Sequence, residues 1–402
     1  MNPIIVLLEL WFLYEDYYDD DMLLNATYNL AMSDIKHAIT EKNSDTIIGI
    51  MIADGWTYKH NDRWYTFLAK LENSAKKLGI KKFYLMPGQC HDYQKELDKR
   101  NLDFEILEFH WPVQEIKNNY TKENRFNKIQ PWNCNANKFM FLGGAPARIK
   151  RIGLLSKLYD AGLLNKNAVW SFYPPWKEDD IEFCRNLLSH YNDTEYDNFI
   201  KFATNELDST YNETHFYIKM SGKELADTDE FNKTWWKNVG YIENKHFQDT
   251  SISIVNDGPG DDLRFVTEKV WIPVVNDHPF ILADSPARFQ YCKDIGLRMF
   301  EDYMLIKDYG YIEDSHHQID AVVKNVKYFL ENAHRFEKDI KKDITHNKKV
   351  FWKLADQNFK ICNNLEKNIG ATGLYKYLTN TYLGNYNRIP KLSDIPVHKD
   401  EQ

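Results

Sequence analysis

The chain has 402 residues, of which 43% are hydrophobic and 27% charged, a composition that excludes a mainly disordered protein and provides for two or three domains. Its net charge of −8 argues against a general polyanion-binding protein, although a local basic groove is compatible with an acidic total. The five cysteines form no C-x-x-C pair and no short cluster, which argues against a disulfide framework or a zinc knuckle and fits a reducing cytoplasm.

The N-terminal run MNPIIVLLEL is apolar, but it has no basic flank and contains Glu9. It also continues into acidic residues rather than a small-residue cleavage site, so it predicts a buried strand and not a signal peptide. No stretch approaches the roughly 18 uninterrupted apolar residues of a membrane span. We therefore expect a cytoplasmic protein.

The first third of the chain alternates short apolar runs with longer amphipathic ones, a pattern typical of strands connected by helices in a parallel sheet. We expect strands at 4–10, 46–53, 82–86 and 104–109, and helices at 22–40, 63–78 and 91–100.

A polar stretch at 118–138, without a clear period, indicates a connection between domains. The alternation then restarts, while residues 192–248 are polar and aromatic and give no assignable pattern. The expected strands are 139–142, 168–172, 251–255 and 279–283, and the expected helices are 147–164, 181–191, 267–275, 318–341 and 348–367.

Two successive halves of this kind predict an α/β protein with two facing Rossmann-like domains, parallel sheets and long C-terminal helices. We expect domains at 1–130 and 131–330, with helices in 331–402 packing across both. In such sheets ligands bind outside the carboxyl ends of the strands. The loops after Leu142, Val255 and Ala283 are therefore the candidate site.

The first of these loops begins with Gly143 and Gly144, where the backbone can approach a ligand closely, and Pro146 fits the first turn of the following helix. Arg148 and Arg151 are three residues apart, hence on one face near the positive end of that helix. The pair would form a pyrophosphate clamp. The alternative is two solvated arginines that pair with surface acids.

A second helix start carries the motif Thr267-Glu268-Lys269. Thr267 is a good N-cap, and Lys269 in the first turn would add a point charge for a phosphate. Glu268 would repel phosphate but can accept hydrogen bonds from a ribose diol. The alternative is a plain cap with a surface ion pair. Pro273 is expected to bend this helix.

The order of elements around this motif carries a family resemblance. A strand that ends in Asn256-Asp257 precedes the motif, while a P-F-I strand and the turn at 295–297, with Phe300 after it, follow. This order resembles the donor-binding half of the α-1,3-fucosyltransferase-like glycosyltransferases, and more closely glycosyltransferase-like proteins of phages and large viruses. The segment APARIKR is similar to the Arg-x-x-Arg helix that opens that half, and the resemblance covers roughly residues 138–330.

The resemblance implies a GT-B glycosyltransferase that binds a UDP- or GDP-linked sugar and requires no metal or other cofactor. It also implies a protein of the cytoplasm, which would be the host cytoplasm if the chain is viral. Lys269, Arg148 and Arg151 would then neutralise the departing diphosphate, and Glu268 would hold the ribose. Where the fucosyltransferase pattern has Phe-Glu-Asn, this chain has residues 255–257, Val-Asn-Asp, so the donor sugar and the role of Asp257 stay open.

An inverting reaction would need a carboxylate to deprotonate the acceptor hydroxyl. Asp54, after the second expected strand, is best placed, with Glu9 and Asp16 as alternatives; a loop cap is the competing interpretation of Asp54. We interpret Asp19-Asp20-Asp21 as a solvated helix start rather than a metal site, and His316-His317 as a surface patch.

For the acceptor, the leading hypothesis is a hydroxymethylated pyrimidine in phage DNA, flipped and stacked on aromatic side chains. The chain has 11 Trp and 25 Tyr, among them Trp235-Trp236 and the aromatic residues of 173–176. The alternatives are a glycan or protein acceptor in a virus or bacterium, and a non-catalytic nucleotide-binding module. A basic groove would be lined by the lysine-rich segment 338–353 and by Lys122, Arg125, Lys128 and Lys138. The alternative for the lysine-rich segment is a solvated helix face, which is the commoner case.

Overall fold

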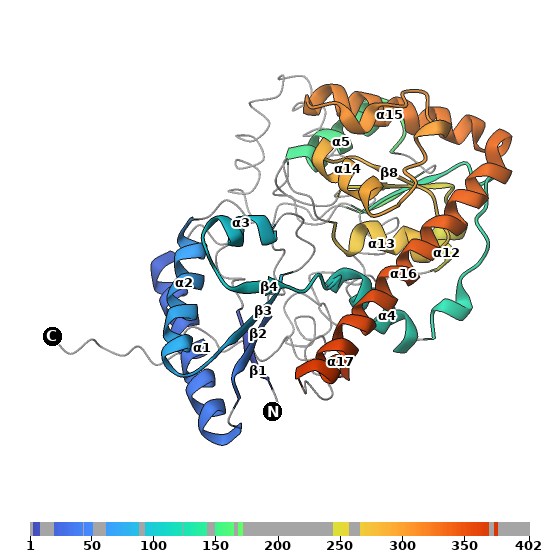
Figure 1. Cartoon of the computed structure of the whole chain (residues 1–402). Coiled ribbons are helices and arrows are strands. Elements are labelled where there is room, and N and C mark those ends of the chain that lie inside the picture. The colour runs from blue at the N-terminus through green and yellow to red at the C-terminus, as the bar shows by residue number, and fades with distance from the viewer. Residues whose placement is uncertain are drawn as a thin grey trace, which may run out of the picture. The chain divides into compact units, whose positions relative to one another are not determined.

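The fold was analysed in a computed structural model of the chain (Figure 1), in which residues 3–8, 20–42, 44–50, 62–87, 93–122, 124–142, 149–164, 168–171, 244–256, 266–369 and 374–376 are described. The chain divides into two compact units, Met1–Glu115 with Leu354–Gln402, and Ile116–Lys353. The sequence suggested boundaries near 130 and 331 instead. Each unit contains a four-stranded sheet in which neighbouring strands are parallel, which confirms the α/β class.

The sheet of the first unit has the order β1-β2-β3-β4, so each strand lies next to its successor in the chain. The register aligns Ile4 with Ile47 and Thr46 with Lys82. The strands are β1 (Ile4–Leu7), β2 (Thr46–Ile50), β3 (Lys82–Met86) and β4 (Phe104–Ile106), and the helices between them are α1 (Asp20–Lys42), α2 (Asp62–Lys77) and α3 (Tyr93–Lys99).

Side chains alternate between the two faces of this sheet, as the period of a strand requires. Ile47 and Leu85 join the core beneath α1 and α2, which also contains Trp64 and Leu68. Their neighbours in sequence turn the other way: Ile48, Ile50 and Met86 pack with Cys362 and Leu365 of the long helix α16 (Glu337–Ile369). The last third of the chain thus completes the hydrophobic core of the first unit.

The sheet of the second unit has the order β6-β5-β7-β8. The chain moves from β5 to β6 on one side and then crosses to β7 on the other, so a topological switch point lies between β5 and β7. Ligands of open α/β sheets bind at such points, outside the carboxyl ends of the strands. The strands are β5 (Phe139–Leu142), β6 (Ala168–Ser171), β7 (Ile252–Val255) and β8 (Phe280–Leu282).

Helices surround the sheet of the second unit (Figure 1). They are α5 (Ile149–Asp160), α12 (Asn244–Gln248), α13 (Glu268–Val275), α14 (Pro286–Asp294) and α15 (Ser315–Asn332). Short 3-10 turns lie at η3 (Phe126–Lys128), η5 (Glu301–Tyr303), η6 (Tyr309–Tyr311) and η7 (Ala333–Phe336), and α17 (Leu374–Lys376) belongs to the first unit.

Two expectations about element boundaries were wrong. The strand expected at 104–109 ends at Ile106, and helix α4 (Trp111–Lys122) occupies the start of the segment expected to be an irregular connection. The helix break expected near 341–348 lies instead at η7, and α16 is continuous through the lysine-rich segment. Buried Ile340, Ile344 and Phe351 share one face of α16 at helical spacing, and this packing outweighs the weak helix propensity of the Thr-His-Asn stretch.

Three buried asparagines fasten loops to the long helices, and each binds both backbone groups of one loop residue. Asn325 of α15 accepts from Ile306 N at 2.7 Å and donates to its carbonyl at 2.9 Å. Asn347 of α16 does the same for Arg298, at 2.8 and 2.8 Å, and Asn358 for His110, at 2.8 and 3.0 Å. None of the described helices is long and apolar enough to span a bilayer.

Candidate functional site

Asn256 lies at the switch point of the second sheet, directly after β7. Its amide Nδ2 donates to the carbonyl of Ala283, directly after β8, at 2.7 Å. Because β7 and β8 are neighbours, this bond joins the carboxyl ends of two strands, and the buried Asn256 side chain forms part of the floor of the edge where ligands bind.

Arg151 reaches the same residue from the first turn of α5. Its Nε lies 3.1 Å from Oδ1 of Asn256, and Nη2 lies 3.2 Å from the Asn256 carbonyl. The arginine is 2% exposed, so the structure places a buried guanidinium at the switch point rather than on the surface. A buried charge is retained only where partners compensate it, and here it fixes the end of β7 against the start of α5.

The Thr267-Glu268-Lys269 motif begins α13, as predicted. Oγ1 of Thr267 accepts from Lys269 N at 3.3 Å, which confirms the N-cap. Nζ of Lys269 lies 2.6 Å from Oε1 of Glu268, and the two side chains are 32% and 21% exposed. The cation is therefore neutralised by its neighbour, yet both groups remain accessible to a ligand. Pro273 lies inside this short helix, which ends two residues later.

Two opposing effects act on the Glu268 carboxyl. Burial raises its pKa, whereas the Lys269 ammonium and hydrogen bonds from Lys269, its own backbone and Thr267 lower it, and the pKa lies below the ordinary value. Glu268 is consequently ionised at neutral pH. An ionised carboxylate only accepts hydrogen bonds, which suits contact with hydroxyl groups and not with phosphate.

Lys269 and Asn256 line one small cavity of about 50 Å³ at this edge of the sheet. Its remaining lining is mostly apolar, from β5, β7, α12 and α13, and Lys269 supplies its charge. Arg151, which binds Asn256, and Lys269, which shares the cavity with it, thus approach a single residue from two different helix starts. Two of the three cationic residues that the sequence singled out are thus associated with Asn256, while the third, Arg148, lies outside the described residues.

The sequence interpretation missed a buried ion pair at the same edge. Nη1 of Arg288 lies 2.6 Å from Oδ1 of Asp284, with side chains only 1% and 2% exposed. Ser285 between them caps α14 by accepting from Arg288 N at 3.3 Å, and Pro286 is the first residue of the helix. The signal was present in the segment DSPAR, where an acid and an arginine four residues apart flank a Ser-Pro helix start.

Several predicted site residues lie outside the described residues, and their roles stay predictions. They are Gly143, Gly144, Arg148 and Asp257 at the switch point, and Asp54, Glu9 and Asp16 as candidate bases. Asp19 is also outside, whereas Asp20 and Asp21 begin α1.

The remaining charged features have structural roles among the described residues. Oδ1 of Asp314 caps α15 by accepting from His317 N at 2.8 Å. Arg125 is buried over the Tyr120 ring, 4.7 Å from its centroid, so it does not line an open basic groove; Lys122 and Lys128 are exposed. In the described parts of the chain, no group of three His, Cys, Asp or Glu side chains is arranged to hold a metal ion.

No protein-family model matches the sequence, and no curated protein matches it significantly. Two solved structures are similar in fold. One is an α,α-trehalose 6-phosphate synthase from Burkholderia multivorans, with 8% identity over 89% of this chain and 78% of that one and a TM-score of 0.42. The other is a UDP-forming α,α-trehalose-phosphate synthase from Burkholderia xenovorans, with 11% identity over 90% of this chain and 84% of that one and a TM-score of 0.43.

Proposed function

We propose that this protein is a glycosyltransferase that uses a nucleotide-sugar donor, UDP- or GDP-linked. The observation that supports the proposal is the approach of Arg151 and Lys269 to Asn256 at the switch point of the second sheet. A diphosphate bound there would lie at the carboxyl edge, beside the N-terminus of α13 and the Lys269 side chain, over the floor that Arg151 holds in place.

In the proposed reaction the acceptor oxygen bonds to the anomeric carbon, and the bond from that carbon to the diphosphate breaks with its electron pair on the leaving group. Negative charge therefore grows on the diphosphate, and cations fixed beside it stabilise the transition state more than the ground state. Lys269 supplies that charge directly, and Arg148 is proposed to join it. Arg151 holds Asn256 and so positions the floor of the site.

Glu268 is proposed to bind the ribose of the nucleotide. Its ionised carboxylate accepts from two hydroxyls, and it would release Lys269 to the diphosphate when the donor binds. This exchange keeps every charge compensated, because the lysine moves from a carboxylate to a more highly charged partner.

The proton of the acceptor hydroxyl has to leave during transfer, and we propose Asp54 as its acceptor. The leading acceptor is a hydroxymethylated pyrimidine in phage DNA, and a glycan is the second candidate. The burial of Arg125 weakens the case for a continuous basic groove and so favours testing the glycan alongside DNA.

The proposal is tested by release of UDP or GDP from a panel of nucleotide-sugars, without acceptor and with either hydroxymethylcytosine DNA or neutral glycans. Lys269→Ala is expected to lower the turnover rate by about 100-fold, as loss of a charge-stabilising group does. The matched control is Lys349→Ala, an exposed lysine of α16 outside the site. Turnover that Lys269→Ala leaves unchanged would contradict the role of this cation.

A non-catalytic nucleotide-binding module is the second candidate function, since the Glu268–Lys269 pair is also a stable arrangement without substrate. Such a module would show a thermal shift with UDP or GDP but release no nucleotide from any donor.

A further inference from the structure

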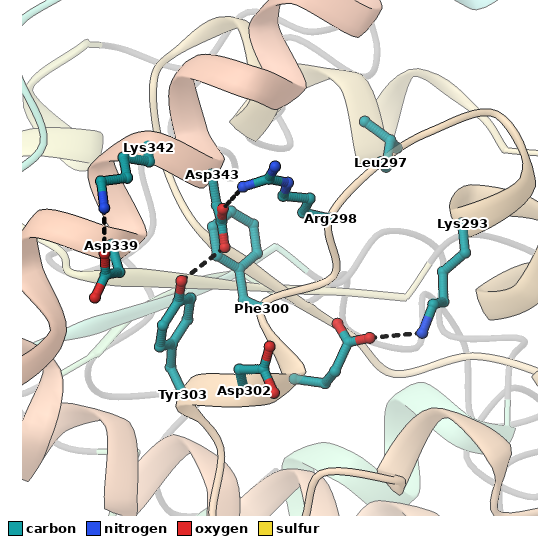
Figure 2. A pocket seen from close by; sticks show the side chains of 10 residues that line it. Lys293, Leu297, Arg298, Phe300, Asp302, Tyr303, Asp339, Lys342 and Asp343 are labelled. Carbon is teal, nitrogen blue, oxygen red and sulfur yellow. Dashed lines mark hydrogen bonds and ion pairs between the residues drawn. The ribbon is translucent and has the colours of Figure 1, made fainter.

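A second, larger pocket lies in the same unit, between the C-terminal end of α14, the turn that follows it and the N-terminal half of α16 (Figure 2). Its volume is about 470 Å³. This is within the range of small-molecule sites, which measure roughly 300 to 1,000 Å³.

The pocket is remote from the candidate donor site. Phe300 in its wall packs against Phe280, the first residue of β8, with ring centroids 5.6 Å apart. Ala283, which binds Asn256, follows the last residue of the same strand. Helix α14 likewise runs from the donor edge to the pocket, where Lys293 precedes its last residue. The pocket therefore lies at the amino edge of the sheet and the donor site at the carboxyl edge.

Every charged side chain that lines the pocket already has a partner of opposite charge. No charge is left uncompensated, so an ionic ligand would have to displace one of these partners. The pairs are Lys293 with Glu301 at 2.6 Å, Lys342 with Asp339 at 2.7 Å, Arg298 with Asp343, and Asp302 with Lys307 at 3.4 Å.

Hydrogen-bonding capacity nevertheless remains. Arg298 lines the pocket, uses Nη1 for Asp343 and has a side chain that is 52% exposed, so its other guanidinium donors are accessible from solvent. Asp343 also accepts from Tyr303 Oη at 2.7 Å, and Figure 2 shows both side chains directed at this carboxylate. Burial, with this hydrogen bond second, raises the pKa of Tyr303, which keeps its hydroxyl protonated. Buried Leu297 and Phe300 form a packed apolar wall behind these polar groups.

We propose that this pocket binds a neutral saccharide. A sugar hydroxyl is both donor and acceptor, so it can use the remaining carboxylate lone pairs and guanidinium hydrogens without breaking any ion pair. The C–H face of a sugar ring can pack on the partly exposed ring of Tyr303, which also lines the pocket. An inorganic anion or the phosphate of a nucleotide would instead have to displace one of the acidic partners.

The binding groups are held in place before a ligand arrives. The Asn347 side chain forms hydrogen bonds with both the backbone N–H and the carbonyl of Arg298. Phe300 has a left-handed backbone with φ 62°, a conformation that packing must enforce in a residue other than glycine. Such preorganisation lowers the entropy lost on binding. A saccharide bound here would anchor a glycan acceptor away from the reacting centre.

Saturation-transfer NMR titrations with maltose, cellobiose, lactose and N,N′-diacetylchitobiose test the proposal. At least one of these disaccharides is expected to bind. Arg298→Lys keeps the positive charge but loses the planar set of guanidinium donors, and it should weaken binding about 10-fold. Lys342→Met should weaken it as well, whereas Lys341→Met, one residue away on α16 and outside the pocket lining, should not.

The proposal would be overturned by a lack of binding of all four disaccharides, or by binding that Arg298→Lys and Lys342→Met leave unchanged. Tighter binding of glucuronate or inorganic phosphate at the same residues would also contradict a neutral ligand. The test is independent of the transferase proposal, because Lys269→Ala should lower donor turnover by about 100-fold and leave disaccharide binding unchanged.

Discussion

At the scale of single residues, Glu268 has two tasks: it neutralises Lys269 in the free protein and is proposed to accept from the ribose. Hydrogen bonds to a charged group contribute about 1.5–3 kcal/mol. We therefore expect the protein to bind UDP at least 10-fold more tightly than 2′-deoxy-UDP, and Glu268→Gln to remove most of that difference. Calorimetric titration measures both affinities. An unchanged ratio in the variant would place the ribose elsewhere.

The ionisation of Glu268 sets the pH range of this contact. Its folded pKa lies below the ordinary value, so its stabilising pair with Lys269 is complete above the unfolded pKa and is lost only as pH falls through the lower, folded value. Glu268 should not titrate in donor-binding profiles between pH 5 and pH 8, and a transition near neutrality would have to come from another group.

His278 is a second residue with a marked pH effect. Its ring is buried and bonds to Ser253 Oγ at 3.0 Å and to the Thr250 carbonyl at 2.9 Å. Burial lowers its pKa from 6.5 to about 4, although hydrogen bonds with Thr250 and Pro279 oppose the shift. Between about pH 4 and pH 6.5 the ring therefore binds a proton in the unfolded chain but stays neutral in the folded protein. The folded state loses about 3 kcal/mol of stability as pH falls through this range.

Thermal unfolding between pH 4.5 and pH 7.5 tests this effect. The melting temperature of the wild type should fall with pH more steeply than that of His278→Gln, which has no titratable ring. Parallel curves for the two proteins would show that His278 does not carry the proton linkage.

At the scale of elements, buried amide side chains connect the long helices to the loops. Asn358 binds N and O of His110, both within the first unit. Asn358→Leu leaves two buried backbone groups without these bonds. Each unsatisfied group costs about 1–3 kcal/mol, and water that enters the site reduces this cost, so we expect a loss of about 2–4 kcal/mol of stability. Asn364→Leu, exposed on the same helix, is the control, and equal destabilisation by both changes would contradict the account.

The same elements show where sequence patterns suffice and where they fail. The strands of both sheets were predicted because short apolar runs are bounded by turn residues, and α13 because Thr267 is a recognisable cap. Helix α4 and the continuity of α16 were missed because tertiary burial of residues such as Trp111 and Ile344 decides them, not local propensity.

At the scale of the whole molecule, the sequence predicted two parallel α/β sheets, and both are present. It did not predict that α16 belongs to two units, because no local signal shows which core Cys362 and Leu365 enter. The candidate site was predicted in part: Arg151 and Lys269 were selected from spacing at helix starts, whereas the Asp284–Arg288 pair was overlooked although its two residues are only four apart. The pocket lined by Arg298 and Asp343 could not be predicted, because its residues lie in two segments distant in sequence.

The central claim is that Lys269, together with the segment of Arg148 and Arg151 at the start of α5, binds one diphosphate. It is tested most directly by comparing the affinities of UDP and GDP with those of uridine and guanosine. We predict that the diphosphate of one nucleotide strengthens binding about 100-fold, and that Lys269→Ala removes most of this gain without changing nucleoside affinity. Equal binding of nucleotide and nucleoside, or equal weakening of both by Lys269→Ala, would contradict the claim.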